Sequence, residues 1–159
     1  NPATMIGYFK DPERTAGTKR NGWIYTGDIG CQDKDGYFFF VGRKKEVIRR
    51  RGELLSPAEI ESVINRHPKV QESAVLGVSS GLGIGEEEVK AYISLKPGET
   101  ATPQEIISWC KGKLAEFKIP RFIEFRADFP RSAIGRIQKN LLKTEKQDLT
   151  SGCYDRLRE

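Results

Sequence analysis

The spacing of apolar residues from position 56 onward predicts a small domain of helices and strands. Two segments carry apolar residues at helical intervals, and each opens with a Ser/Thr-Pro-x-Glu sequence, which is typical of a helix start with a capping box. We therefore expect helices over residues 56–67 and 102–114, and a last helix over residues 137–146. Segments rich in apolar residues predict strands over residues 70–78, 89–95 and 122–125. This order indicates an α+β fold in which helices pack on a mixed or antiparallel sheet.

The first 43 residues show a different pattern, which predicts short β-strands. Residues 1–22 are rich in Gly, Pro, Thr and charge, and we expect a loop with one short helical turn near residues 11–16. Strand-forming residues occupy positions 23–26 and 37–41, and the Asp-Lys-Asp-Gly sequence at 33–36 is typical of a turn. These features predict a small hairpin-like unit.

Length and composition limit the class of protein. The chain has 159 residues, of which 37% are hydrophobic and 31% charged, and this suits one soluble domain or a small domain with an appendage. No apolar run approaches the roughly 18 residues that a membrane-spanning helix needs, so no membrane span is expected. The chain starts without Met and without a signal peptide, and we expect it to be part of a longer protein.

The cysteine and histidine content disfavours several kinds of site. Cys31, Cys110 and Cys153 show no CxxC or metal-ligand spacing, so we expect free thiols in a reducing compartment, and hence a cytoplasmic protein. His67 is the only histidine, which disfavours a zinc site and the Ser-His-Asp and Cys-His schemes of catalysis. The glycine-rich stretch at residues 79–85 matches no phosphate-loop pattern and is expected to be a turn.

Positive charge is concentrated in two segments, residues 43–51 and 131–146, and the net charge is +5. A modestly basic chain suits nucleic acid, an anionic membrane surface or a phosphorylated small molecule, and the same clusters also suit a solvated surface. The aromatic residues lie in the apolar strands rather than among the cations. That arrangement argues against a nucleic-acid platform, so no nucleic-acid partner is expected.

Four short features carry candidate chemistry. Asp28 follows a predicted strand, where its carboxylate can accept hydrogen bonds from a diol such as a ribose, and Arg43 follows a glycine and can reach a phosphate or ribose. Gly52, next to Glu53, allows close approach of a ligand or another backbone. A loop of small residues presents one cation, Arg136, before a helix, where it can engage an anionic group. Taken singly, Asp28, Arg43 and Arg136 are more simply explained by an ordinary turn or a surface charge, and a plain turn explains Gly52 and Glu53 equally well.

The order of these features is far more specific than any one of them. Along the chain lie Gly22-Trp23, Tyr25-Thr26-Gly27-Asp28, Asp35-Gly36-Tyr37, Gly42-Arg43-Lys44-Lys45-Glu46-Val47-Ile48-Arg49, Gly52-Glu53, Pro57-x-Glu59-Ile60-Glu61, His67-Pro68-x-Val70, Gly85-Glu86-Glu87, Phe117-Lys118-Ile119-Pro120 and Pro130-x-Ser132-x-x-Gly135. In this order and spacing, residues 1–138 resemble the C-terminal part of the AMP-forming acyl-CoA synthetases, which belong to the adenylate-forming superfamily. The segment from Lys45 to Glu53 is similar to the carnitine/crotonobetaine-CoA ligase-like branch.

The resemblance implies a division of the chain. Residues 1–44 would be a short β-rich edge of the large N-terminal adenylation domain, and residues 45–159 a small mobile lid domain. Lys45 falls at the hinge about which the family's lid rotates between two poses. Asp28 matches the aspartate that holds the ribose hydroxyls of ATP, and Arg43 matches the arginine on the ribose or phosphate side of the nucleotide.

The resemblance also implies roles for residues of the lid. Arg49 stands where many members have a lysine used in the thioester-forming pose, and Gly52 and Glu53 lie on the loop near the CoA pantetheine arm. Arg136 stands where the family has the lysine that assists adenylation. Arginine keeps the charge, but its planar fork differs from a compact ammonium group. Lys139, one helical turn further on, is an alternative source of that charge.

The implied activity is that of an acid-thiol ligase with ATP, CoA and Mg as cofactors. A small-molecule carboxylate, ATP and CoA would give acyl-CoA, AMP and pyrophosphate through an acyl-AMP intermediate. The family's phosphate loop and acid pocket precede the matching segment, so the implied partner is the enzyme's own N-terminal domain, and Mg would be held mainly there. The acid itself is not indicated by these residues. Two alternatives remain open: a non-catalytic basic binding module, and a catalytically degenerate relative.

Overall fold

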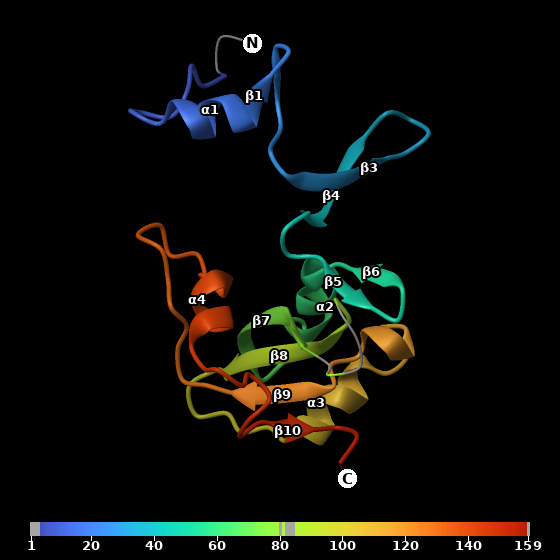
Figure 1. The fold of residues 1–159 in the computed structure, drawn as a ribbon. Coiled ribbons are helices and arrows are strands. Elements are labelled where there is room, and N and C mark those ends of the chain that lie inside the picture. Colours follow the sequence, from blue (N-terminus) through green and yellow to red (C-terminus); the bar gives the residue numbers. More distant parts are fainter. Residues whose placement is uncertain (1–3, 80, 82–84, 159) are drawn as a thin grey trace. The chain divides into compact units, whose positions relative to one another are not determined.

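The chain divides into two compact units, Asn1–Lys45 and Glu46–Glu159. The computed structural model of the protein describes residues 4–79, 81 and 85–158, and Figure 1 traces their elements along the chain. The boundary between the units falls directly after Lys45, which lies exposed in a turn.

The first unit contains one short helix and two antiparallel strand pairs. Its elements are α1 (Pro12–Thr18), β1 (Lys19–Arg20), β2 (Trp23–Ile24), β3 (Asp28–Gln32) and β4 (Phe38–Arg43). β1 pairs with β2, and β3 pairs with β4. The side chain of Asp11 caps α1 by accepting the N–H of Arg14 at 2.9 Å, which gives the predicted helical turn its defined start.

The predicted hairpin is present, but the expected position of its first strand is wrong. The strand that pairs with β4 begins at Asp28, whereas the expected strand at residues 23–26 is reduced to β2. Gly27 has a φ of +76°, and this left-handed residue separates β2 from β3. The turn at residues 33–36 is confirmed, because Asp33 Oδ1 accepts the backbone N–H groups of Asp35 and Tyr37.

The second unit is an α+β domain on a mixed four-stranded sheet, as predicted. Its elements are β5 (Ile48–Arg50), β6 (Glu53–Leu55), α2 (Pro57–Ile64), β7 (Val70–Ser79), β8 (Glu87–Leu95), α3 (Pro103–Cys110), the 3-10 helix η1 (Glu116–Lys118), β9 (Phe122–Phe125), α4 (Lys139–Thr144) and β10 (Tyr154–Asp155). The sheet order is β10–β9–β8–β7, in which β8 and β9 are parallel and the other neighbours are antiparallel. β5 and β6 form a separate two-stranded hairpin.

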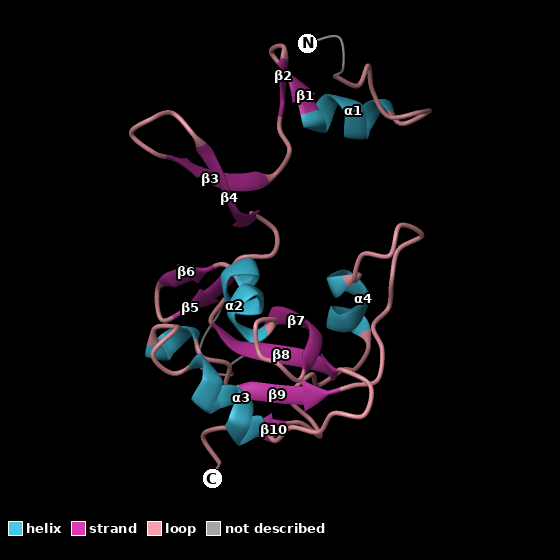
Figure 2. Ribbon diagram, turned by 180° about the vertical axis from the view of Figure 1, so that it is seen from behind, coloured by secondary structure: helices cyan, strands magenta, loops and turns pink. Residues whose placement is uncertain are grey.

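Two hydrophobic clusters cover opposite faces of this sheet, because successive residues of a strand point to opposite sides. On one face, Val75 and Ile93 pack with apolar residues of α2, α3 and the β5–β6 hairpin. On the other face, Leu76 and Tyr92 pack with Leu142 of α4. In Figure 2, α4 lies to the right of both α2 and α3.

The second of the two predicted capping boxes is confirmed, and the first is wrong. Thr102 accepts the N–H of Glu105 through its side chain, and Glu105 Oε2 accepts the N–H of Thr102 at 2.8 Å. Ser56 occupies the N-cap of α2 but makes no side-chain cap hydrogen bond. Glu59 pairs instead with Lys118 at 2.6 Å, so a longer-range ion pair replaces the local one.

Several boundaries differ from the predicted ones. α3 ends at Cys110 instead of residue 114, and α4 begins at Lys139 instead of residue 137. The β5–β6 hairpin and β10 are absent from the prediction, because β5 lies within the basic run at residues 43–51 and β10 is a two-residue strand in a polar tail. The turn predicted at residues 79–85 lies for the most part outside the described residues.

Candidate functional site

The first unit brings two of the predicted nucleotide-binding residues together. Asp28 begins β3, Arg43 ends β4, and the antiparallel register places them directly opposite each other. Arg43 Nε lies 3.1 Å from Asp28 Oδ1. The Asp28 side chain is 33% exposed and the Arg43 side chain 55%, so a polar ligand can reach both. An acceptor and a donor side by side suit the hydroxyls of a ribose.

The second unit places Arg49, Gly52 and Glu53 in the β5–β6 hairpin. The two residues at the centre of its turn, Arg51 and Gly52, have φ angles of +52° and +80°. Positive φ at both positions is characteristic of a type I′ turn, the favoured two-residue connection of a hairpin. No atom of the described part of the chain lies within 4 Å of the position that a Cβ of Gly52 would occupy. The hairpin therefore presents open backbone beside the exposed Arg49.

Gly52→Ala in this chain is expected to lower the free energy of unfolding by about 1 kcal/mol, because an L residue is strained at a left-handed φ. Steric overlap adds nothing, since the surrounding space is open. Arg51→Asn is the matched control and should be neutral or stabilising, because asparagine tolerates this conformation. Urea unfolding followed by circular dichroism measures both. Equal losses for the two variants would contradict the type I′ assignment.

The basic run at residues 43–51 is not a continuous charged surface. Arg50 is only 3% exposed, and its guanidinium lies 2.7 Å from Glu88 Oε2. Burial lowers the pKa of Arg50, and the Glu88 carboxylate opposes that shift. Because alternate residues of β5 face opposite sides, Arg49 is exposed while Arg50 is buried. This arrangement disfavours a basic patch for nucleic acid.

Arg136 lies in a tightly ordered loop before α4. The carbonyl of Ser132 accepts the N–H of Gly135 at 2.9 Å, and the N–H of Ser132 donates to the carbonyl of Arg136 at 2.8 Å. Gly135 has a φ of +78°, which the turn requires. The Arg136 side chain is exposed and has no ion pair within the described part of the second unit. The loop thus fixes the backbone and leaves the cation available to an anionic ligand.

Lys139 is already engaged, and the structure does not support it as a substitute for Arg136. Its Nζ lies 2.7 Å from Glu61 Oε1 and 3.3 Å from Glu46 Oε2. Glu61 Oε1 also accepts the N–H of Val75 at 2.6 Å. Burial raises the pKa of Glu61, and Lys139 opposes this shift. Moving Lys139 away would leave the Glu61 carboxylate buried without its cation.

The hairpin and the Arg136 loop belong to opposite faces of the sheet. Ile48 and Leu55 of the hairpin pack in the cluster with α2 and α3, whereas Ile137 and Leu142 pack in the other cluster. Figures 1 and 2 show β5–β6 and the loop before α4 at different edges of the second unit. The structure therefore does not bring Arg49 and Arg136 into one site.

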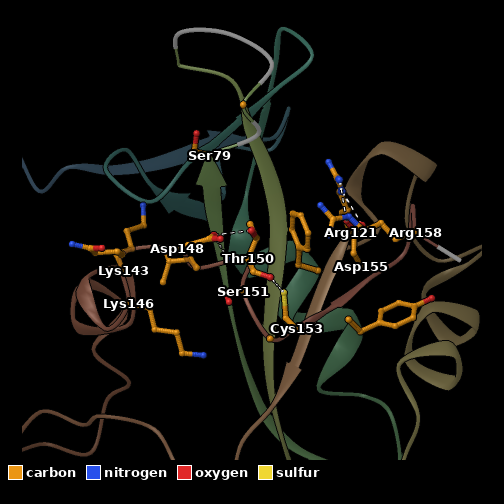
Figure 3. A pocket seen from close by; sticks show the side chains of 16 residues that line it. Ser79, Arg121, Lys143, Lys146, Asp148, Thr150, Ser151, Cys153, Asp155 and Arg158 are labelled. Atoms are coloured by element: carbon orange, nitrogen blue, oxygen red, sulfur yellow. Dashed lines mark hydrogen bonds and ion pairs between the residues drawn. The ribbon is translucent and has the colours of Figure 1, made fainter.

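A pocket of about 960 Å³ lies along the C-terminal segment, and none of the predicted site residues lines it (Figure 3). Its cations are largely matched by carboxylates: Arg121 contacts Asp155 at 2.9 Å, and Lys146 contacts Glu124 at 3.2 Å. Figure 3 shows Arg121 and Asp155 facing each other across a dashed contact. We assign no ligand to this pocket. No sequence pattern predicts this pocket, because the segment from residue 148 onward is polar and without periodicity.

The remaining candidate groups play structural parts. His67 is 8% exposed and packs edge-on against Trp109 with 5.1 Å between ring centroids. The three cysteines are free, as predicted, and burial raises the pKa of Cys110 to about 11. Among residues 4–79, 81 and 85–158, no cluster of His, Cys, Asp and Glu could hold a metal ion. No helix in the described part of the chain is long and apolar enough to cross a membrane.

Comparison with known families gives a match over residues 59–136, to the family described as AMP-binding enzyme C-terminal domain. Among curated proteins, the crotonobetaine/carnitine–CoA ligase of Salmonella paratyphi C (strain RKS4594) is 45% identical over 137 residues. That match covers 86% of this chain and 26% of the ligase. The chain therefore spans about a quarter of the length of the curated relatives it matches.

Two solved structures each match about nine tenths of the chain. One is o-succinylbenzoate CoA synthetase (MenE) from Bacillus subtilis in complex with the acyl-adenylate intermediate OSB-AMP, with a TM-score of 0.81 and 32% identity. It covers 89% of this chain and 28% of that protein. Another is ATP-bound MatB from Rhodopseudomonas palustris, with a TM-score of 0.78 and 36% identity over 92% of this chain and 29% of that protein.

Proposed function

Because the chain, through residues 59–136, belongs to the family of AMP-binding enzyme C-terminal domains, we propose that it is the C-terminal part of an AMP-forming acyl-CoA synthetase. The proposed reaction converts a carboxylic acid, ATP and CoA into acyl-CoA, AMP and pyrophosphate. The observation that carries the proposal is that Arg136, on a loop, and Arg49, in the β5–β6 hairpin, belong to opposite faces of one small domain. Such a domain can serve two reaction steps in turn, each with a different face.

In the first proposed step, Arg136 supports adenylation. A carboxylate oxygen of the acid attacks the α-phosphorus of ATP, the bond to the β-phosphate oxygen breaks, and pyrophosphate leaves with its electron pair. Negative charge grows on the phosphoryl oxygens, and a preorganised cation stabilises that change most. Asp28 and Arg43 would hold the ribose and its neighbouring phosphate, which their adjacent, accessible positions support.

In the second proposed step, the hairpin replaces the Arg136 loop. Residues 45–159 would rotate as the lid about Lys45, while residues 1–44 would stay with the large domain, and the unit boundary directly after Lys45 supports this hinge. The CoA thiol loses its proton and attacks the acyl carbonyl, and AMP leaves. Gly52 and Glu53 would line the path of the CoA arm, and Arg49 would meet its anionic part.

The residues of this chain fit the nucleotide and CoA better than they fit a metal. The facing pair Asp28 and Arg43 suits a ribose, whereas the described residues offer no metal-binding cluster. We therefore propose that Mg, the phosphate loop and the acid pocket are supplied by other parts of the enzyme. The free thiols support a reducing, cytoplasmic compartment. The first acids to test are crotonobetaine and carnitine, after the name of the 45% identical relative.

The 159-residue chain alone is expected to form no measurable acyl-CoA, whereas the full-length enzyme should do so. Both proteins would be incubated with ATP, Mg, CoA and a panel of small carboxylic acids, and acyl-CoA and AMP would be separated by liquid chromatography. AMP and acyl-CoA should appear in equal amounts with the full-length enzyme. Acyl-CoA formation by the isolated chain, or none by the full-length enzyme with any acid, would contradict the proposal.

The alternative of a basic binding module makes a different prediction. A module of that kind would bind nonspecific DNA with a steep dependence on salt. The burial of Arg50 argues against a basic binding module, because residues 43–51 offer no continuous basic surface. A salt titration of DNA binding by the 159-residue chain separates the two functions.

A further inference from the structure

The outer edge of β5 is covered by two carboxylates. Among the described residues, β5 pairs with β6 alone, so its other edge presents backbone N–H groups without a described strand partner. The N–H of Arg49 donates to Glu87 Oε2 at 3.1 Å, and the N–H of Arg51 donates to Glu86 Oε2 at 2.7 Å. Hydrogen bonds to ionised acceptors are roughly twice as strong as neutral ones. We call Glu86 and Glu87 the carboxylate clamp.

A glycine in the neighbouring strand makes room for the clamp. The Glu87 carboxylate lies over Gly77 of β7, and a Cβ at Gly77 would stand only 2.4 Å from Glu87 Cδ. Both oxygens of that carboxylate would be within 2.6 Å of the same Cβ. No side chain fits there without displacing the carboxylate, so Gly77 and Glu87 are suited to each other.

We propose that Glu86 and Glu87 are positioning residues for thioester formation. This inference rests on the proposed function, because it assigns the clamp to the second step. The clamp holds the backbone on both sides of Arg50 and fixes the entry to the Arg51–Gly52 turn. The Arg136 loop packs on the opposite face of the sheet and has no part in the clamp. Loss of the clamp should therefore slow the second step and spare the first.

The test compares the two half-reactions of the full-length enzyme. Adenylation is measured by acid-dependent exchange of pyrophosphate into ATP, and thioester formation by release of acyl-CoA from preformed acyl-AMP and CoA. Glu87→Ala and the double variant Glu86→Ala/Glu87→Ala should slow thioester formation by about tenfold or more, as loss of a charge-assisted hydrogen bond implies. Adenylation should stay within about twofold. Glu99→Ala, which removes an exposed carboxylate from a turn, is the matched control.

Two further measurements examine the clamp independently of activity. Hydrogen exchange of the peptide that spans the hairpin should accelerate by about tenfold in the double variant, because the N–H groups of Arg49 and Arg51 lose their acceptors. Gly77→Ala should also accelerate it, since the added methyl displaces the Glu87 carboxylate. In a Glu87→Ala background the same change should have little further effect.

The possible outcomes separate this inference from the proposed function. Faster exchange together with a selective loss of thioester formation supports it. Equal losses in both half-reactions, or unchanged exchange in the hairpin, overturn the positioning role. If the unmodified enzyme performs neither half-reaction, the proposed function fails and the positioning role with it, whereas the exchange rates still show whether the clamp orders the hairpin.

Discussion

Arg136→Ala in the full-length enzyme is expected to slow acyl-adenylate formation by about 10²–10³-fold, the usual effect of removing one preorganised group that stabilises developing charge. The Ser132–Gly135 turn fixes the backbone at Arg136, and its guanidinium is exposed and without an ion pair in the described part of the second unit. Lys139 is held by Glu61 and Glu46 and does not take its place. Pyrophosphate exchange measures the loss, and acyl-CoA release from preformed acyl-AMP should stay nearly constant.

Two further variants are needed to interpret the effect of Arg136→Ala. Arg136→Lys tests whether the enzyme is a degenerate relative: a large gain in adenylation would mean that arginine is a poor replacement for the compact ammonium group. No gain would count against degeneracy. Arg66→Ala removes another exposed cation, at the end of α2, and should leave both half-reactions unchanged. Normal adenylation in Arg136→Ala, or an equal loss in both half-reactions, would contradict the role proposed for Arg136.

The parts of the fold that the sequence predicts are those with local signals. α2 and α3 begin at Pro57 and Pro103, and β7 and β8 are rich in apolar residues, so composition, periodicity and helix-start residues are enough to predict them. Thr102 and Glu105 form their capping box within four residues of chain. In each case the information lies within one element, and no distant partner is needed.

The elements that the sequence does not reveal depend on distant partners. In the sequence, β5 is part of a charged run, and nothing in that run predicts that Arg50 is buried. Arg50 can be buried because it pairs with Glu88, which lies 38 residues further on. β10 belongs to a polar tail and pairs with β9, where Arg121 and Asp155 make a double contact at 2.9 and 3.0 Å. A propensity scale assigns such residues to the surface. Their structure follows from ion pairs that only the fold brings together.

The candidate site divides in the same way. The ordered motifs identify Asp28, Arg43 and Arg136 as candidate site residues. That Asp28 and Arg43 lie opposite each other follows only from the register of β3 and β4. The sequence predicts the first strand of this hairpin at residues 23–26, whereas β3 begins at Asp28. The register between β3 and β4 therefore cannot be predicted from the sequence. The carboxylate clamp was missed because Glu86 and Glu87 read as ordinary charge before a strand. The one local indication of the clamp is Gly77, which lies within a predicted strand. Glycine weakens a strand, so its presence there indicates that another group approaches the backbone closely.

Glu88→Ala in the 159-residue chain is expected to lower the free energy of unfolding by about 3–5 kcal/mol, because it leaves the buried Arg50 without its carboxylate. Glu88 is 4% exposed, and its oxygens lie 2.7 Å from Arg50 and 3.8 Å from Arg121. Burial lowers the pKa of Arg50, and the Glu88 carboxylate opposes that shift. Urea unfolding in a Trp23→Phe background, followed by the fluorescence of the half-buried Trp109, reports on the second unit.

A second variant separates loss of charge balance from loss of packing. In Arg50→Met/Glu88→Met both charges are replaced by apolar groups of similar length, so most of the lost stability should return. Glu99→Ala, at an exposed position, should change the free energy of unfolding by less than about 0.5 kcal/mol. A cost below about 1 kcal/mol for Glu88→Ala would place the pair among exposed ion pairs and contradict its burial. Because Arg50 lies between the two clamped residues Arg49 and Arg51, its pairing with Glu88 also anchors the hairpin from the side facing the core.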